Sequence, residues 1–578
     1  MSAPVRLDPL QRLAGLEPQA DVDVLILGGG INGAGLYRDL CEQGLRCLIV
    51  DNRDFGSGTS AAPSRLIHGG LKYLETGELG LVAQSTLERN LLLKNAPHRV
   101  RPLQTVIPIF SWLRGIPAAV RTLFGSVTAP RARGAALIKL GLSMYDFYGS
   151  RDRTLPRHRL LRRRRALSWL PALTPDIVAV GVYHDAMIVN PERLVLELVM
   201  DGLRASPVSL AANHAALDSV TDGVLDFHRA DGTRFSVRPR IVVNAAGPWI
   251  DGVNATLGEK SELIGGTKGS HLLLRNEALV RQLDGRMIYF EADDGRICLV
   301  FDYEGLALIG STDIPADDPD TVHCDDEEID YLLHSVSGLL PGVDVAREQI
   351  VHVYSGIRPL PNSAADLPGL ISRDHSAPVL EPTATRAWPI VCLVGGKWTT
   401  FRGFAEEVSD TLLSRLSRRR LTSTRSLPIG GGRDFPVTPP ERRRWLDEQA
   451  ARVPVSRERL DTLLRRYGTQ ALDIANARIA GRPDEQRLPD ATTWSTAEIA
   501  WMARRELVGT LCDVVSRRTD LAITGALTRA DLACMAAVLA EELHWNASRR
   551  RSEVDATLDE LQGRHLMRLG DGTPLQHQ

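Results

Sequence analysis

A glycine-rich string near the N-terminus has the residue types and the spacing of a phosphate-binding turn. Residues 28–35 read Gly-Gly-Gly-Ile-Asn-Gly-Ala-Gly and contain the pattern G-x-G-x-x-G. Glycines at this spacing permit a tight turn and let backbone N–H groups approach a pyrophosphate at the N-terminus of a helix. Asp51 follows Gly33 by 18 positions, where a carboxylate would accept hydrogen bonds from ribose hydroxyls. These residues predict a dinucleotide site.

The flanking segments predict the elements that such a site needs. Residues 21–27, DVDVLIL, are aliphatic and β-branched and end at glycines, which is typical of a buried strand that stops at a turn. We expect a helix over 31–44 and the next strand over 46–50. Strand, glycine turn, helix and strand in this order open a doubly wound α/β fold.

A second glycine turn, far along the chain, favours a flavin over a nicotinamide. Residues 391–397, VCLVGGK, predict a strand that ends in Gly-Gly, and a helix follows Trp398 with Thr399 or Thr400 as its N-cap. The positive end of a helix dipole, aimed at an isoalloxazine ring, would stabilise the anionic reduced flavin. An ordinary strand–Gly-Gly–helix connection is the alternative interpretation.

Composition narrows the classes of protein to which the chain could belong. The chain has 578 residues, a formal net charge of −2 and 43% hydrophobic residues, which indicates a globular protein of two or more domains without a basic balance for nucleic acid. The seven cysteines are scattered and form no CxxC pair, so we expect no disulfide framework, no metal site and a cytoplasmic, reducing compartment. The N-terminus carries no secretory pattern, and no apolar run approaches the ~20 residues of a spanning helix.

A basic stretch over 112–168 interrupts this even charge distribution. It contains the run Arg162 to Arg165, nine further Arg and Lys residues, and apolar residues such as Trp112 and Phe124, and Trp169 follows directly after it. A basic, amphipathic and partly aromatic segment is typical of a surface that lies on anionic lipid. A solvated helical face in a domain insertion is the alternative.

Seven segments together resemble the FAD-dependent glycerol-3-phosphate dehydrogenase family along nearly the whole chain. They are GGGINGAG (28–35), DFGSGTSAAPSRLIHGGLKYLE (54–75), NAAGPWID (244–251), TKGSHLLL (267–274), IGSTD (309–313), YSGIRPL (354–360) and GGKWTTFR (395–402). The resemblance implies FAD as cofactor, and hydride transfer from C2 of sn-glycerol 3-phosphate to give dihydroxyacetone phosphate. It further implies electron transfer to a quinone and a peripheral position on the inner face of the cell membrane. Oligomeric state is left open, with a homodimer as one arrangement.

The resemblance also implies a domain organisation. The FAD-dependent oxidoreductase unit would span 20–410, with a discontinuous Rossmann-type domain from segments 20–110, 180–255 and 350–410. Residues 260–345 would form a β-rich substrate domain, residues 112–170 a basic insertion, and residues 411–578 a C-terminal helical domain.

Site residues carry over position by position. Cofactor contacts are expected from Gly28, Gly29, Gly30, Ile31, Asn32, Gly33, Asp51, Asn52, Ser57, Gly58, Thr59, Ser60, His68, Gly69, Gly70, Gly247, Gly396, Lys397 and Thr399. Catalysis is assigned to His271, Lys397 and Arg358, and substrate binding to Lys72, Tyr73, Arg358 and Arg373. A guanidinium suits a phosphate dianion, and a histidine suits a base that takes the C2 hydroxyl proton.

Several alternatives stay open at this point. His271 could be a structural histidine, Arg358 could pair with a carboxylate, and Lys397 could be a solvated lysine at a strand end. Lys72 stands where the family usually has arginine, and residues 190–193 read Asn-Pro-Glu-Arg in place of an acidic element. An FAD-dependent amine or amino-acid oxidase, a glycerol-3-phosphate oxidase that uses oxygen, and a binding module without turnover are the competing functions.

Overall fold

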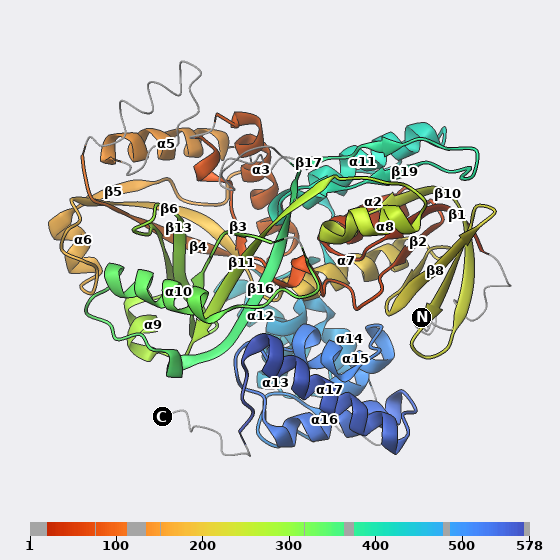
Figure 1. Cartoon of the computed structure of the whole chain (residues 1–578). Coiled ribbons are helices and arrows are strands. Elements are labelled where there is room, and N and C mark those ends of the chain that lie inside the picture. The colour runs from red at the N-terminus through yellow and green to blue at the C-terminus, as the bar shows by residue number, and fades with distance from the viewer. Residues whose placement is uncertain are drawn as a thin grey trace.

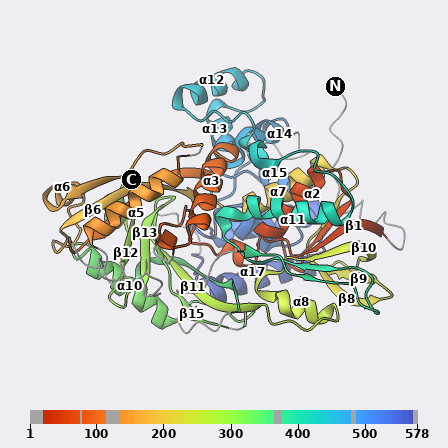
Figure 2. The same cartoon turned by 90° about the horizontal axis from the view of Figure 1, so that it is seen from above.

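The computed structural model describes residues 20–74, 77–112, 134–150, 152–316, 318–362, 375–477 and 486–570. Two sheets lie side by side, and a layer of helices from the C-terminal part packs below both in the view of Figure 1. Seen from above, the two sheets meet along a line between α3 (Leu79–Asn95) and α11 (Phe401–Arg415) (Figure 2).

The first sheet holds the strand that begins the glycine turn. Its strand order is β18-β19-β10-β1-β2-β7, and β1 (Ala20–Leu27) is parallel to both β2 (Cys47–Val50) and β10 (Arg234–Asn244). Alternate residues of β1 enter two separate cores on opposite faces, and Leu25 and Ile26 are fully buried. A strand buried on both faces must be apolar throughout, which is why 21–27 lacks the alternation of an exposed strand. The other strands are β7 (Leu210–Ala212), β8 (Ala215–Thr221), β9 (Val224–Arg229), β18 (Val379–Leu380) and β19 (Ile390–Cys392).

Three helices cover one face of this sheet. The helix after the glycine turn, α2 (Ile31–Glu42), packs against α7 (Pro191–Ala205) and α11, and all three contribute to one core. Close packing requires glycine on α2, because a Cβ at Gly35 would lie 2.6 Å from the ring of Phe401.

The second sheet has ten strands and the order β15-β11-β14-β13-β12-β4-β6-β3, with β16 paired to β11 and β5 to β6. Its strands are β3 (Leu66–Ile67), β4 (Val100–Ile109), β5 (Arg159–Arg162), β6 (Ala179–Ile188), β11 (Ile264–Leu274), β12 (Arg286–Glu291), β13 (Ile297–Tyr303), β14 (Leu306–Gly310), β15 (Ile314–Pro315) and β16 (Ile350–Pro361). Helices α5 (Ala135–Tyr148), α6 (Arg163–Trp169), α9 (Glu277–Leu283) and α10 (Asp326–Leu339) flank it.

This arrangement differs from the segments expected from the sequence. Strands β3, β4, β6 and β16 fall within 20–110, 180–255 and 350–410, yet they belong to the second sheet and not to the nucleotide-binding one. The basic insertion also contributes a strand, since β5 pairs with β6. An apolar run predicts a strand but does not predict which strand it pairs with, because pairing depends on contacts between residues far apart in sequence. The division into domains stays a prediction.

The C-terminal part forms a separate helical layer with its own core. It contains α12 (Pro439–Ala450), α13 (Arg457–Tyr467), α14 (Ala471–Ala475), α15 (Thr496–Arg505), the π-helical turn η10 (Asp513–Arg518), α16 (Arg529–Glu542) and α17 (Ala547–His565). Side-chain caps fix where several of these helices begin: Thr438 and Thr528 each complete a reciprocal capping box. Within the described part of the chain, no helix combines the length and the apolar character needed to cross a bilayer.

Candidate active site

A cavity of about 400 Å³ opens at the carboxyl ends of β1, β2 and β10. This is the edge at which open α/β sheets bind ligands. Thirteen of the predicted cofactor residues line it: Gly28, Gly30, Ile31, Asn32, Asp51, Asn52, Ser57, Gly58, Thr59, Ser60, Gly247, Gly396 and Lys397. Most of the residues predicted to bind a cofactor therefore lie on one cavity. That they contact the cofactor stays a prediction.

The glycines of the turn have different roles. Gly28 has φ +108°, and a Cβ there would lie 2.5 Å from the carbonyl oxygen of Ala245; a Cβ at Gly33 would lie 2.0 Å from the carbonyl oxygen of Gly28. Both glycines are required by the fold itself. At Gly30 a Cβ would meet only the Ser60 hydroxyl, at 3.1 Å, so this glycine leaves open the space in front of α2.

Asp51 directly follows β2 and is hydrogen-bonded to the glycine turn. Its carboxylate accepts hydrogen bonds from the backbone N–H groups of Gly29, at 2.7 Å, and Arg53, at 2.8 Å. Burial raises the pKa of Asp51 to about 6, against the lowering effect of those two hydrogen bonds. A ligand that donates hydroxyl hydrogen bonds to the carboxylate would favour its ionised form.

The His-Gly-Gly loop and Thr399 lie beside the cavity and do not line it. The Thr399 hydroxyl accepts a hydrogen bond from the His68 N–H at 3.2 Å, and His68 Nδ1 accepts one from the Gly70 N–H at 3.1 Å. Thr400, one of the two residues predicted as N-cap, occupies the N-cap position of α11, but its side chain makes no capping hydrogen bond. Thr399 instead ties the two glycine loops together.

At the other end of the cavity, Lys397 turns inward. Its side chain is buried, with Nζ 3.2 Å from the Ser85 hydroxyl and 3.5 Å from the centroid of the Tyr73 ring. The alternative that Lys397 is a solvated lysine at a strand end is therefore excluded. The structure brings Lys397 and Tyr73 together, and the cation lies over the face of the aromatic ring.

His271 lies on β11, in a second group of predicted site residues. It is 1% exposed, stacks on Tyr354 with ring centroids 4.8 Å apart, and its Nε2 lies 2.8 Å from the Ser64 hydroxyl. Burial, and then the nearby charges of Arg358 and Arg65, hold the pKa of His271 well below its ordinary value, so the imidazole is neutral. Within the described residues, its buried Nδ1 has no hydrogen-bond partner.

Arg358, on β16, is engaged within the protein. Its guanidinium donates to the carboxylate of Asp313 at 2.9 Å, and to the Ser311 hydroxyl and the Thr312 carbonyl at 3.0 Å each. The alternative that Arg358 pairs with a carboxylate is therefore confirmed, with Asp313 as the partner. About a fifth of the Arg358 side chain is exposed, and whether it also contacts a substrate stays a prediction.

Two predicted substrate residues cannot be placed. Arg373 lies outside the described residues, and the structure describes the backbone of Lys72, in the turn Leu71–Leu74, but not its side chain. Of the basic stretch, residues 113–133 and Arg151 also lie outside the described part of the chain.

Sequence reasoning missed a buried cluster that fixes the His-Gly-Gly loop. The Gly69 N–H donates to the Tyr145 hydroxyl at 2.7 Å and to Asp185 at 3.2 Å, and Arg89 donates to the same Asp185 oxygen at 2.8 Å. These side chains come from α5, β6 and α3, so no local pattern could have linked them. It also missed the cavity wall formed by Arg53, Ala215–Leu217, Phe227, Pro248, Trp249, Gly252, Val253 and Thr256.

The cavity fits an extended dinucleotide. It runs from the Gly395–Lys397 turn, past the N-terminus of α2, to the wall around Phe227 and Thr256. Gly247 and Gly252 line it, and a Cβ on either would meet no atom within 4 Å, so both leave room for a ligand. Its volume lies within the range of small-molecule and cofactor sites.

Comparison with known proteins agrees with this geometry. A family model described as FAD dependent oxidoreductase matches residues 23–411, and one described as C-terminal domain of alpha-glycerophosphate oxidase matches residues 422–550. A glycerol-3-phosphate dehydrogenase of Synechocystis is 32% identical and covers 87% of this chain and 89% of its own. A D-erythritol 1-phosphate dehydrogenase of Brucella abortus is 30% identical over 87% of this chain and 95% of its own.

A solved structure supports the fold. The glycerol-3-phosphate dehydrogenase of Bacillus halodurans, complexed with FAD, is 20% identical, aligns over 98% of both chains and has a TM-score of 0.73. The fold and the cavity together define an FAD-dependent oxidoreductase. Within that class, the chain belongs to the FAD-dependent glycerol-3-phosphate dehydrogenase family.

Proposed function

We propose that the chain oxidises sn-glycerol 3-phosphate to dihydroxyacetone phosphate. The observation that carries the proposal is the buried Lys397, which follows Gly396 at one end of the cofactor cavity and holds a positive charge over the Tyr73 ring. A fixed cation beside the reacting carbon would attract an anionic substrate and stabilise charge that develops on the C2 oxygen. FAD, when bound, supplies the hydride acceptor. The relative at 32% identity carries the corresponding name.

His271 is the proposed base. Neutral imidazole is the form that accepts a proton, and burial together with Arg358 and Arg65 keeps His271 in that form. The Ser64 hydroxyl and the stacked Tyr354 ring fix the plane of the imidazole. His271 would take the C2 hydroxyl proton as the hydride leaves.

Arg358 is the proposed phosphate anchor, and its pairing with Asp313 provides the test. Arg358→Met should lower kcat/KM for glycerol 3-phosphate by roughly 30- to 1,000-fold, since a buried dianion loses a charge-assisted partner. Asp313→Asn is the matched variant, because it removes the ion pair and keeps the guanidinium. If Arg358 only stabilises the fold, the two variants will lose activity and thermal stability to the same extent.

A four-carbon polyol phosphate is the second candidate substrate, because a relative of nearly equal similarity is a D-erythritol 1-phosphate dehydrogenase. Anaerobic bleaching of the flavin by glycerol 3-phosphate, erythritol 1-phosphate and an amino acid, at matched concentrations, ranks the three chemistries. We expect glycerol 3-phosphate to have the highest kcat/KM. Faster bleaching by the amino acid would support an oxidase of amines.

A quinone is the proposed electron acceptor, with oxygen as the alternative. Re-oxidation of the substrate-reduced protein by a short-chain quinone should be much faster than re-oxidation by air-saturated buffer. The reverse order would indicate a glycerol-3-phosphate oxidase.

We also propose that the end of the molecule formed by α5 and α6 contacts an anionic membrane. Arg162 to Arg165 are all exposed, as are Leu140 and Phe147 on α5 and Phe110 and Trp112 after β4. Helices α5 and α6 lie at the same end of the molecule in both views (Figures 1 and 2). Exposed apolar side chains beside cations are typical of an interfacial surface.

A further inference from the structure

Two wall segments of the cofactor cavity are held by one turn of the C-terminal layer. The first wall, residues 51–57, contributes Asp51, Asn52, Arg53 and Ser57 to the lining, and the second, residues 212–217, contributes Ala215 to Leu217. The walls are joined by backbone hydrogen bonds: Asp51 N–H to Ala212 O, His214 N–H to Arg53 O and Ala215 N–H to Asp51 O, each 2.9 Å. The two walls therefore form one hydrogen-bonded unit.

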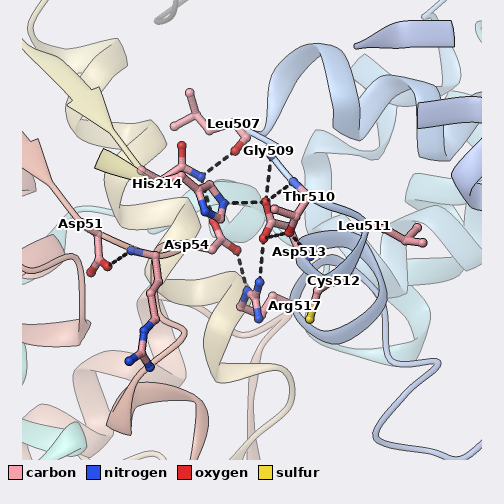
Figure 3. A network of polar contacts seen from close by, with 12 residues as sticks. Asp51, Asp54, His214, Leu507, Gly509, Thr510, Leu511, Cys512, Asp513 and Arg517 are labelled. Carbon is pink, nitrogen blue, oxygen red and sulfur yellow. Dashed lines mark hydrogen bonds and ion pairs between the residues drawn. The ribbon is translucent and has the colours of Figure 1, made fainter. Parts of the chain in front are cut away.

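Asp54 receives the strongest contacts from the C-terminal turn, residues 506–518. Its carboxylate accepts hydrogen bonds from Arg518, at 2.7 and 2.9 Å, and from Arg517 at 2.6 Å, and the Asp54 and Arg518 side chains are fully buried. Figure 3 shows Asp54 and Arg517 pointing toward one another between the two layers. A buried, bidentate guanidinium–carboxylate contact is both directional and difficult to replace by water.

The second wall is held by the same turn. His214 Nε2 lies 2.9 Å from Asp513, and Asn213 Nδ2 donates both to Asp54, at 3.0 Å, and to the Leu507 carbonyl, at 2.7 Å. The His214 ring packs on Gly509, where a Cβ would lie 2.7 Å from it. Asp513 is itself fixed by the N–H groups of Gly509 and Thr510.

The cluster is an ion-pair network and not a cation site. Ligand atoms of Asp54, His214 and Asp513 lie within 4.8 Å of one another, which is close enough to surround a metal ion. However, both oxygens of Asp54 already accept from arginines, and Arg517 Nη2 also donates to Asp513 at 2.7 Å. Two guanidinium groups supply the positive charge that a metal ion would bring.

We propose that this turn is a clamp on the nucleotide side of the FAD site, so that the C-terminal layer determines how long the cofactor stays bound. The clamp residues, Arg517, Arg518 and Asp513, act through Asp54 and His214 and touch neither substrate nor flavin ring. They are positioning residues for the walls that would enclose the adenosine half of FAD. The C-terminal layer thus has a function in cofactor retention.

The clamp holds the second wall through one histidine, His214, whose pKa it raises. Burial alone would lower the pKa of His214, but the hydrogen bond and charge of Asp513, with Asp54 nearby, outweigh both burial and Arg517 and raise it. A raised histidine pKa means that the ion pair is present below that pKa and is lost as pH rises through it. FAD release should therefore accelerate at alkaline pH.

The test measures FAD release from the full-length holoprotein by the recovery of flavin fluorescence. Arg517→Met should release FAD about tenfold faster than the native protein, since one charge-assisted hydrogen bond to the wall is lost. Arg459→Met is the matched control, because Arg459 on α13 forms a comparably buried pair with Glu498 on α15, inside the same layer but outside residues 506–518. Arg517→Lys should restore part of the retention.

Two outcomes would overturn the proposal. One is equal release rates for Arg517→Met and Arg459→Met at similar losses of thermal stability, which would mean that the clamp contributes to FAD retention only through the stability of the layer. The other is a native release rate in His214→Gln at all pH values. If Arg517→Met fails to fold, His214→Gln decides alone, since the His214 side chain is partly exposed and its replacement is tolerated more easily. This variant should release FAD faster than the native protein at pH 6, and the difference should shrink as pH rises.

Discussion

At the scale of single residues, the glycines of the turn separate folding from cofactor binding. Gly30→Val should fold, because residue 30 has φ −73° and a Cβ there would meet only the Ser60 hydroxyl. The variant should nevertheless lose FAD, since the valine side chain would occupy the space in front of α2 that the cofactor needs. Gly33→Val should instead destabilise the fold by at least about 3 kcal/mol, as its Cβ cannot avoid the Gly28 carbonyl. The ratio of flavin to protein absorbance and the thermal unfolding of both variants check this. A yellow Gly30→Val protein would contradict it.

Asp51 predicts how FAD affinity depends on pH. Burial raises the pKa of Asp51 to about 6, and ribose hydroxyls donate more strongly to the ionised carboxylate than to the neutral acid. FAD affinity of the apoprotein should therefore fall as pH drops below about 6, by up to roughly tenfold per pH unit. Asp51→Asn should bind FAD weakly and without this dependence. A titration of apoprotein with FAD between pH 4.5 and 8 measures both.

At the scale of elements, the Arg89–Asp185–Tyr145 cluster decides the position of the His-Gly-Gly loop. Asp185→Asn leaves the buried Arg89 without its counter-charge and should lower the free energy of unfolding by about 3–5 kcal/mol. Tyr145→Phe removes a hydroxyl that accepts from Gly69 and Arg89 and donates to Asp185, and it should lower this free energy by about 2 kcal/mol. Denaturant unfolding gives both values, and equal losses would mean that the charge pair contributes nothing beyond a hydrogen bond.

The same elements show how far the sequence could predict the structure. The strand, glycine turn and helix over 20–42 were predictable, because apolar patterning and glycine spacing act within a few residues of one another. Arg89, Tyr145 and Asp185 were not, since three elements far apart in sequence must first pair before these side chains meet. Arg358 shows where prediction from sequence ends. An arginine at this position predicts an anionic partner, but only the fold shows that the Asp313 carboxylate is already that partner.

At the scale of the whole molecule, the charge distribution predicts how the protein meets a membrane. Replacing Arg162 to Arg165 by glutamine should weaken co-sedimentation with anionic vesicles, since each cation near the surface contributes about 1 kcal/mol. The matched control replaces four exposed arginines of the C-terminal helices, Arg443, Arg444, Arg550 and Arg551, which changes the net charge equally at another part of the surface. Reduction of dye acceptors by glycerol 3-phosphate should be nearly unchanged in both variants.

The apolar residues of the same surface give an independent readout. Leu140→Ser with Phe147→Ser removes exposed apolar area from α5 and leaves its charge unchanged, so its loss of vesicle binding should persist at high salt, where screening has weakened the contribution of the arginines. Measuring all three variants at two salt concentrations separates the electrostatic from the hydrophobic contribution. Equal weakening by the C-terminal control would show that net charge alone drives association. Native binding that is absent, or that ignores both salt and these substitutions, would exclude this end of the molecule as the membrane surface.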